Sequence, residues 1–199
     1  MFVPDWANVS RETLTQLEAY AALLVKWNKT INLVSPSTIA DLWERHIWDS
    51  YQLVDLIPDD AILADIGSGG GLPGLIIAIA KPQTSITLIE RDQRKCAFLT
   101  QAALSFDLKH VTVTNQDIKN ITSRHSLVTG RALASLDVLC ELSYPLLLKD
   151  AICLFPKGEN FASEIEEANK TWDFTHTIIP SKTHDSACII SVSKLKPRV

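Results

Sequence analysis

A glycine-rich stretch directly after a short apolar run constrains this chain most. The apolar run covers residues 61–64, and the stretch that follows is Asp65-Ile66-Gly67-Ser68-Gly69-Gly70-Gly71-Leu72-Pro73-Gly74, before the apolar residues 75–80. Glycines let a backbone turn tightly and approach a ligand without clashes from Cβ atoms. The order predicts a buried strand, a turn and a helix, as at the ligand site of many α/β proteins. A plain strand-to-helix turn without a ligand is the alternative.

The same residues match two ligand templates. Gly69-x-Gly71-x-x-Gly74 fits the dinucleotide fingerprint, in which the start of the helix receives a pyrophosphate. Asp65-x-Gly67-x-Gly69-x-Gly71 is typical of class I methyltransferases that bind S-adenosylmethionine. A carboxylate at the end of the strand suits the amino group and the sulfonium cation of that donor, whereas it would repel a pyrophosphate. The acid therefore favours the methyl donor over the dinucleotide.

The composition is that of an ordinary soluble globular protein. The chain has 199 residues, of which 46% are hydrophobic and 21% charged. Its apolar runs are too short to span a bilayer, and no basic, apolar leader stands at the N-terminus. The four cysteines are widely separated and contain no Cys-x-x-Cys pair, so we expect neither disulfides nor a metal site. We therefore expect a cytoplasmic protein without a membrane anchor.

The charge of the chain does not decide whether the protein binds nucleic acid. The net charge of −4 argues against a basic coat over the whole surface. Basic residues are nevertheless concentrated at 91–95 and in the tail at 194–198, while Glu164, Glu166 and Glu167 form an acidic cluster. A nucleic-acid footprint requires a local basic face, not a basic average. Composition is therefore neutral on this point.

The order of the expected elements indicates the fold class. We expect strands at residues 61–66, 85–90, 111–115, 126–130, 151–155, 173–179 and 187–193. We expect helices near residues 73–81, 92–105, 135–149 and 160–171. Alternation of this kind predicts an α/β, Rossmann-like, mostly parallel sheet, and the last two strands, with no helix between them, predict a C-terminal antiparallel hairpin.

Helices should precede this sheet. Ser10 begins a helix whose apolar positions recur at helical spacing as far as Trp27, and a second helical region of one or two pieces covers about residues 37–56. We therefore divide the chain into an N-terminal helical extension, residues 1–58, and a methyltransferase-like core, residues 59–199. Together they should form one compact unit.

Several polar residues follow the expected strands. Open α/β sheets bind ligands at the carboxyl ends of their strands. Glu90 ends the second strand and could accept hydrogen bonds from ribose hydroxyls of either candidate ligand. Residues 115–119 end the third strand, where Ile118 could cover an adenine ring. Arg131 and Lys157 follow the fourth and fifth strands, where a cation requires a carboxylate or a ligand as its partner.

Two polar clusters interrupt the apolar pattern of the N-terminal helices. Asn28 and Asn32 lie around the break between the helices. His46 shares a helix face with Asp49 or Ser50, next to Arg45. Helix capping and a hydrogen-bonded structural histidine explain these clusters as well as a ligand role does.

Taken together, these motifs resemble those of a known family. The chain resembles the 16S ribosomal RNA guanine-N7 methyltransferases, the glucose-inhibited division protein B family. The matching segments are Lys26-Trp27-Asn28-Lys29-Thr30-Ile31-Asn32-Leu33, Arg45-His46-Ile47-Trp48-Asp49-Ser50, Asp65 to Gly74, Glu90 with Lys95-Cys96-Ala97-Phe98-Leu99, Arg131-Ala132 and Lys157-Gly158. The helical clusters joined to Gly-Leu-Pro-Gly are more specific than the glycine turn alone.

The resemblance implies a class I methyltransferase fold, S-adenosylmethionine as donor, and 16S rRNA or the small ribosomal subunit as partner. It places cofactor contacts at Gly67, Leu72, Ile118, Lys119 and Arg131, in addition to Asp65, Gly69 and Glu90 of the glycine turn and strand end. It places the substrate near Asn28, Asn32, Arg45, His46 and Lys157. We expect the backbone of Lys119, not its side chain, to make any contact.

The resemblance also implies a reaction. Guanine N7 carries a lone pair and no proton, so methyl transfer to it in the decoding region needs no general base. We therefore assign Arg131 and Lys157 positioning roles. A methyltransferase acting on a small molecule or a protein, and a ribosome-assembly module without catalysis, are the rival functions; an NAD-dependent oxidoreductase is more distant. We expect a monomer.

Overall fold

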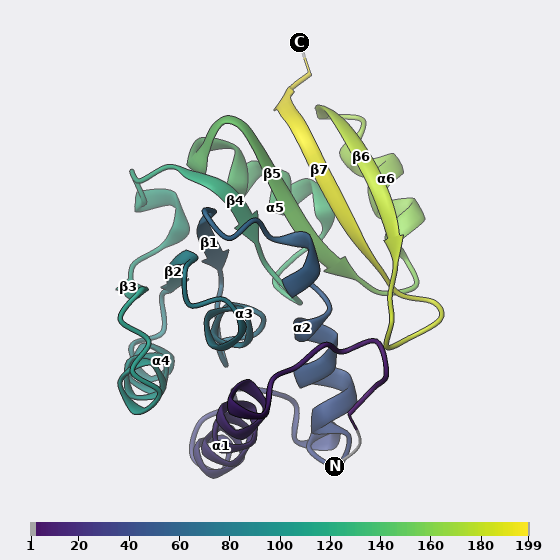
Figure 1. Ribbon diagram of the computed structural model, residues 1–199. Coiled ribbons are helices and arrows are strands. Elements are labelled where there is room, and N and C mark those ends of the chain that lie inside the picture. Colours follow the sequence, from purple (N-terminus) through teal and green to yellow (C-terminus); the bar gives the residue numbers. More distant parts are fainter. Residues whose placement is uncertain (1–2, 199) are drawn as a thin grey trace.

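The computed structural model describes residues 3–198, which are built around one seven-stranded sheet (Figure 1). The strands are β1 Ile62–Ile66, β2 Ser85–Glu90, β3 Val111–Asn115, β4 His125–Thr129, β5 Leu147–Lys157, β6 Trp172–Pro180 and β7 Cys188–Pro197. Their order is β3-β2-β1-β4-β5-β7-β6, with β1 to β5 parallel and β7 antiparallel to both neighbours. The predicted parallel sheet with a C-terminal antiparallel hairpin is confirmed.

Helices cover both faces of the sheet. They are α3 Gly74–Ala80, α4 Gln93–Ser105, α5 Leu136–Ser143 and α6 Phe161–Ala168. Successive side chains of a strand point to opposite faces. In β1, Leu63 accordingly packs into the hydrophobic cluster that contains α3 and α4, whereas Ala64 and Ile66 pack into the cluster that contains α5 and α6. The sheet therefore lies between two helical layers, each with its own hydrophobic cluster.

The N-terminal segment forms a further layer outside α3 and α4 (Figure 1). It begins with α1 Arg11–Asn28, whose first turn is capped by Ser10 Oγ accepting from the Thr13 N–H at 3.1 Å. The rings of Tyr20 and Trp27 pack on Phe98 of α4 at centroid distances of 6.4 and 5.8 Å. One hydrophobic cluster therefore contains residues of both the extension and the core.

The second helical region is more broken than predicted. It consists of η1 Pro36–Thr38, the π-helix η2 Trp43–Trp48, the single turn α2 Asp49–Tyr51 and η3 Val54–Leu56. Every residue from 47 to 53 is buried except the half-buried Asp49. A segment enclosed on nearly all sides has no amphipathic stripe, so helical periodicity could not locate its turns.

The predicted helix at 135–149 was too long. Helix α5 ends at Ser143, a short 3₁₀ turn Tyr144–Leu146 follows, and β5 already begins at Leu147. Pro145 lies in that turn, where its missing N–H and its ring prevent the α-helix from continuing. A lipid bilayer could not be crossed by any helix in the described part of the chain, since none combines sufficient length with sufficient apolar character.

Candidate active site

The glycine-rich loop joins the end of β1 to the start of α3. Gly67, Gly69 and Gly71 adopt φ angles of +66°, +53° and +80°, a left-handed conformation that favours glycine. Space excludes a side chain as well, because a Cβ on Gly71 would lie 2.4 Å from a methyl carbon of Leu75. The left-handed backbone at all three positions, and the close contact with Leu75 at Gly71, therefore favour the glycines that the sequence pattern singled out.

Asp65 lies buried beneath this loop at the end of β1. Its Oδ2 atom accepts a hydrogen bond from the Gly74 N–H at 3.3 Å, while Oδ1 has no hydrogen-bond partner among the described residues. Burial raises the pKa of this carboxyl to about 7, against the lowering effects of the nearby Ser68 hydroxyl and of the Gly74 N–H. A buried acceptor without a donor, next to a glycine loop, fits a ligand with an ammonium group such as S-adenosylmethionine.

Glu90, at the end of β2, fixes the other side of the loop. Its Oε2 atom accepts from the Gly69 N–H and its Oε1 atom from the Asp92 N–H, both at 2.9 Å. Each carboxylate oxygen can accept a second hydrogen bond. The side chain therefore holds the loop in place and still has the capacity to accept from the hydroxyls of a ribose.

The remaining predicted cofactor residues differ in what they contact. Leu72 is buried just before α3. Ile118 and Lys119 begin a 3₁₀ turn after β3, and the Lys119 N–H already donates to the Asp117 side chain at 3.0 Å. Lys119 Nζ lies 3.6 Å from a carboxylate oxygen of Glu141. Both the backbone N–H and the ammonium group of Lys119 thus already contact other residues of the protein. The role of Lys119 in cofactor binding stays a prediction.

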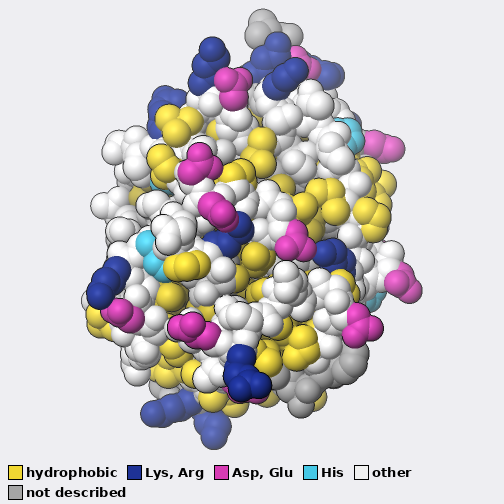
Figure 2. All heavy atoms as spheres, in the orientation of Figure 1, with side chains coloured by type: hydrophobic (Ala, Val, Ile, Leu, Met, Phe, Trp, Pro, Cys, Tyr) yellow, Lys and Arg dark blue, Asp and Glu magenta, His cyan; other side chains and the backbone are white. Residues whose placement is uncertain are grey.

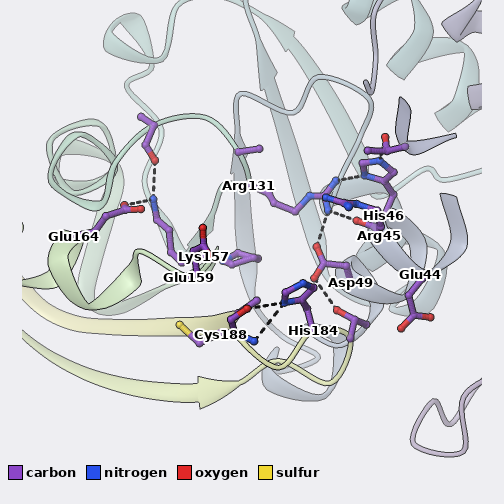
Figure 3. A pocket seen from close by; sticks show the side chains of 18 residues that line it. Glu44, Arg45, His46, Asp49, Arg131, Lys157, Glu159, Glu164, His184 and Cys188 are labelled. Carbon is purple, nitrogen blue, oxygen red and sulfur yellow. Dashed lines mark hydrogen bonds and ion pairs between the residues drawn. The ribbon is translucent and has the colours of Figure 1, made fainter. Parts of the chain in front are cut away.

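A cavity of about 720 Å³ lies beyond the ends of β4 and β5 (Figure 3). Its walls come from η1, η2 and α2, from the ends of β4 and β5, and from the loop between β6 and β7. Its charged lining consists of the carboxylates Glu44, Asp49, Glu159 and Glu164 and the cations Arg45, Arg131 and Lys157. The cations are thus matched by at least as many acids.

Arg131 connects the sheet to the helical extension across this cavity (Figure 3). Its Nη1 donates to Asp49 Oδ2 at 2.6 Å and to the Arg45 carbonyl oxygen at 3.0 Å, and its Nη2 donates to His46 Nδ1 at 2.7 Å. The side chain is only 13% exposed. The sequence predicted that this arginine would need a carboxylate or a ligand as partner, and the structure supplies Asp49.

His46 is held as a neutral ring. Arginine can only donate, so His46 Nδ1 accepts and Nε2 carries the proton, which it donates to Thr38 Oγ1 at 2.7 Å. Burial, and then the positive charge of Arg131, lower the pKa of His46 to about 4. The expected helix-face neighbour Asp49 is present, but both side chains turn toward Arg131 instead of toward each other.

Lys157 is buried against α6. Its Nζ donates to Glu164 Oε2 and to the Ala134 carbonyl oxygen, both at 2.7 Å, and its side chain is 7% exposed (Figure 3). Glu164 Oε2 also accepts from the Leu136 N–H at 2.7 Å. The lysine therefore ties the end of β5 to α5 and α6. The sequence had placed Glu164 only in an acidic cluster, which carried no signal of this pairing.

The two predicted asparagines lie elsewhere. Asn28 Oδ1 accepts from the N–H groups of Leu33 and Val34 at 2.8 and 3.0 Å and so closes the loop after α1. Asn32 is exposed, and neither asparagine lines the cavity. Of the predicted substrate residues, the structure brings Arg45, His46 and Lys157 together and leaves these two apart.

Sequence reasoning missed residues that hold the site from a distance. The Tyr20 hydroxyl of α1 donates to the Gly70 carbonyl oxygen at 2.5 Å. Gln52, 3% exposed, accepts from the Lys182 N–H at 2.9 Å and donates to the carboxylate of Asp49 at 3.0 Å. Thr183 of the β6–β7 loop also donates to that carboxylate, at 3.1 Å. A polar group on an otherwise apolar segment was the only local sign of Tyr20 and Gln52.

Known proteins resemble this chain over nearly its whole length. A protein of Gluconobacter oxydans described as ribosomal RNA small subunit methyltransferase G is 50% identical over 189 residues, which cover 94% of this chain and 97% of the relative. A protein of Acidiphilium cryptum with the same description is 46% identical, with coverage of 96% and 89%. Such identity over such length indicates the same fold and the same family.

Solved structures and the family profile agree. The M. jannaschii TYW2 protein in complex with AdoMet superimposes with a TM-score of 0.58 at 10% identity, covering 86% of this chain and 80% of that one. A predicted O-methyltransferase from Agrobacterium tumefaciens gives 0.58 at 16% identity, with coverage of 74% and 80%. These likenesses concern the fold. The profile of the family described as rRNA small subunit methyltransferase G matches residues 13–188, and the chain belongs to that family.

Proposed function

We propose that this protein transfers the methyl group of S-adenosylmethionine to N7 of one guanine in the decoding region of 16S rRNA. Its family is one of S-adenosylmethionine-dependent enzymes that methylate the RNA of the small ribosomal subunit. The observation that carries the choice of N7 is the cavity at the ends of β4 and β5, in which Arg131 and Lys157 are each paired with a carboxylate.

The donor would bind at the glycine loop. Asp65, Gly67, Gly69, Leu72, Glu90, Ile118, Lys119 and Arg131 form the proposed donor site. When bound there, S-adenosylmethionine supplies an electrophilic methyl group. The guanine N7 lone pair carries no proton, so no side chain has to remove one. The protein's contribution is therefore alignment and electrostatics.

The charges of the cavity suit a purine that becomes cationic as it is methylated. An unpaired cation would oppose that charge, whereas Arg131 and Lys157 are neutralised by Asp49 and Glu164. The neutral His46 adds no positive charge at pH 7. The arginine and the lysine each retain N–H groups beyond those engaged, which could orient the guanine O6 atom. Both are positioning residues in this proposal, with Arg45 and His46 on the substrate side.

The direct test is methylation of undermethylated small subunits. The purified protein is incubated with labelled S-adenosylmethionine and the subunits, and N7-methylguanine is mapped by chemical cleavage of the RNA. A single modified guanine in 16S rRNA is the expected result. Donor binding with label transferred only to a small molecule or a protein, or with subunit binding and no transfer, would overturn the proposal in favour of the two rival functions.

We also infer that the protein acts as a cytoplasmic monomer and that residues 1–58 and 59–199 unfold as one unit. The single hydrophobic cluster shared by α1 and α4 supports the second inference. Light scattering coupled to gel filtration would test the first, and a single urea transition followed by tryptophan fluorescence and by circular dichroism would test the second.

A further inference from the structure

Basic residues gather at the end of the sheet opposite to the cavity. We call Arg124, Lys149, Lys194 and Lys196 the basic end. Arg124 directly precedes β4, Lys149 lies near the start of β5, and the other two lie near the end of β7. Because β7 is antiparallel to β5, its last residues lie beside the first residues of β5. Lys and Arg side chains accordingly gather at the upper end of the molecule in Figure 2, beside the C-terminal end of β7 in Figure 1.

The basic end contains a groove. A cavity of about 340 Å³ is lined by Arg124, Lys149 and Lys194, together with Tyr144, which is 40% exposed to solvent. Asp150 is the acid in its lining. Three cations against one carboxylate leave this groove with a net positive charge, unlike the cavity at the other end of the sheet.

The cations of the basic end are not engaged in ion pairs with other described residues. Within residues 3–198, none of the four forms an ion pair, and Arg124 donates only to the Leu147 carbonyl oxygen, at 3.0 Å. The neighbouring Arg198, by contrast, is paired with Asp173 at 2.9 Å. Like charges held close together repel one another, and a polyanion placed over them would relieve that repulsion.

We propose that the basic end binds the phosphate backbone of the rRNA substrate at a place remote from the methylated guanine. This inference rests on the proposed function. Phosphate contacts supply most of the attraction between a protein and a nucleic acid. Neither the net charge of −4 nor the charge-matched cavity provides that attraction.

The two sites lie at opposite ends of one strand. Arg124 precedes β4 and Arg131 follows it, which at about 3.3 Å per residue separates them by roughly 20 Å. An RNA that reaches both must therefore extend several nucleotides from the target base, or fold so that a second strand meets the basic end. The protein would hold a structured RNA between a neutral reaction cavity and a basic anchor.

The variants Lys149→Gln/Lys194→Gln and Lys149→Glu/Lys194→Glu test this inference. Both positions line the groove and neither belongs to the proposed donor or guanine site. For the Gln variant we expect KM for the small subunit to rise about 10-fold at roughly 0.1 M salt, with a larger rise for the Glu variant. The slope of log affinity against log salt should fall by about 1.5. The kcat at saturating subunit and the donor affinity should not change.

Arg11→Gln/Lys109→Gln is the matched control, since it removes the same charge from exposed positions on α1 and before β3. An unchanged KM and salt slope in the groove variants, or an equal loss in the control, would overturn the inference. A wild-type protein that binds subunits without methylating them would instead refute the proposed function. The salt slope of binding, measured by sedimentation with subunits, still decides the role of the basic end in that case.

Discussion

The two ends of β4 carry arginines in opposite circumstances. Arg131, after the strand, is nearly buried and bonded to Asp49, His46 and a backbone carbonyl group. Arg124, before the strand, is exposed and has one carbonyl contact. Desolvation explains the difference, because a cation removed from water requires a counter-charge, whereas an exposed one is stabilised by solvent. Cations at the cavity thus build the site, and those at the basic end remain available to a partner.

The largest expected effect comes from Arg131→Ala, which leaves the Asp49 carboxylate and His46 without their shared donor. We expect single-turnover methylation to fall at least about 100-fold, because the helical extension loses this one contact with the end of β4 and the proposed site is no longer aligned. Lost charged hydrogen bonds should lower the free energy of unfolding by about 2 kcal/mol. Rapid-quench kinetics and urea denaturation measure the two quantities.

Arg124→Ala is the control for this change, at the other end of the same strand. It should leave the single-turnover rate at saturating subunit unchanged. An Arg131→Ala variant with the wild-type rate, or an equal loss of rate in both variants, would remove the distinction between the two ends.

Lys157→Met sharpens the comparison within the cavity. It keeps the apolar stem but leaves Glu164 with only the Leu136 N–H as donor. We expect the free energy of unfolding to fall by about 1–3 kcal/mol, and adding Glu164→Gln to recover part of that loss. Methylation should fall by about 10-fold, less than in Arg131→Ala. A double variant no more stable than the single one would show that the ion pair is not what Lys157 contributes.

Gln52→Ala tests whether the β6–β7 loop, which forms one wall of the cavity, contributes to binding of the subunit. The change removes the acceptor for the Lys182 N–H and a donor to Asp49. We expect KM for the subunit to rise several-fold and donor affinity to stay constant, with a stability loss of about 1 kcal/mol. Gln116→Ala, at an exposed glutamine after β3, is the control. A fall in kcat alone, with KM unchanged, would argue against a role in shaping the wall.

The smallest effect concerns pH. The pKa of His46 in the folded protein, about 4, lies below its ordinary value of 6.5, so the unfolded chain binds this proton more readily. Its contribution to stability is therefore complete above pH 6.5 and is lost as the pH falls toward 4. The raised pKa of Asp65, about 7, acts with the opposite sign, making stability fall as pH rises from 3.8 to 7.

Only the difference in unfolding free energy between wild type and His46→Gln separates the effect of His46 from that of the other titrating groups. The gap in unfolding free energy between the two proteins should narrow from pH 7 to pH 5, as measured by urea denaturation at each pH. His184→Gln, an exposed histidine of the same cavity, provides the comparison. A gap that stays constant over this range would mean that His46 titrates normally in the folded state.

The local pattern of residues was sufficient to predict the sheet and the glycine loop. Five apolar segments, with helices between most of them, and two further segments with only a turn between them predicted the parallel strands and the hairpin. The spacing of Asp65, Gly67, Gly69 and Gly71 predicted a turn that requires glycine, and three of these positions have positive φ angles where glycine stands. Both features depend on residues that lie near one another in the sequence, so they produce a pattern that can be recognised in the sequence. Where that pattern disappears, as in the enclosed residues 47–53, the prediction of helices failed in detail.

The amino-acid sequence by itself determined the fold class, the edge of the sheet at which the candidate site lies and the residues that could carry charge there. Only the tertiary structure decided which charges are neutralised. Arg131 meets Asp49 across 82 residues of chain, and Gln52 meets Lys182 across 130. Such pairs depend on where the ends of distant strands and helices come together in the fold. A periodic pattern within one segment carries no information about that arrangement. Arginine therefore forms a structural ion pair at one end of β4, whereas at the other end it makes no ion pair within residues 3–198.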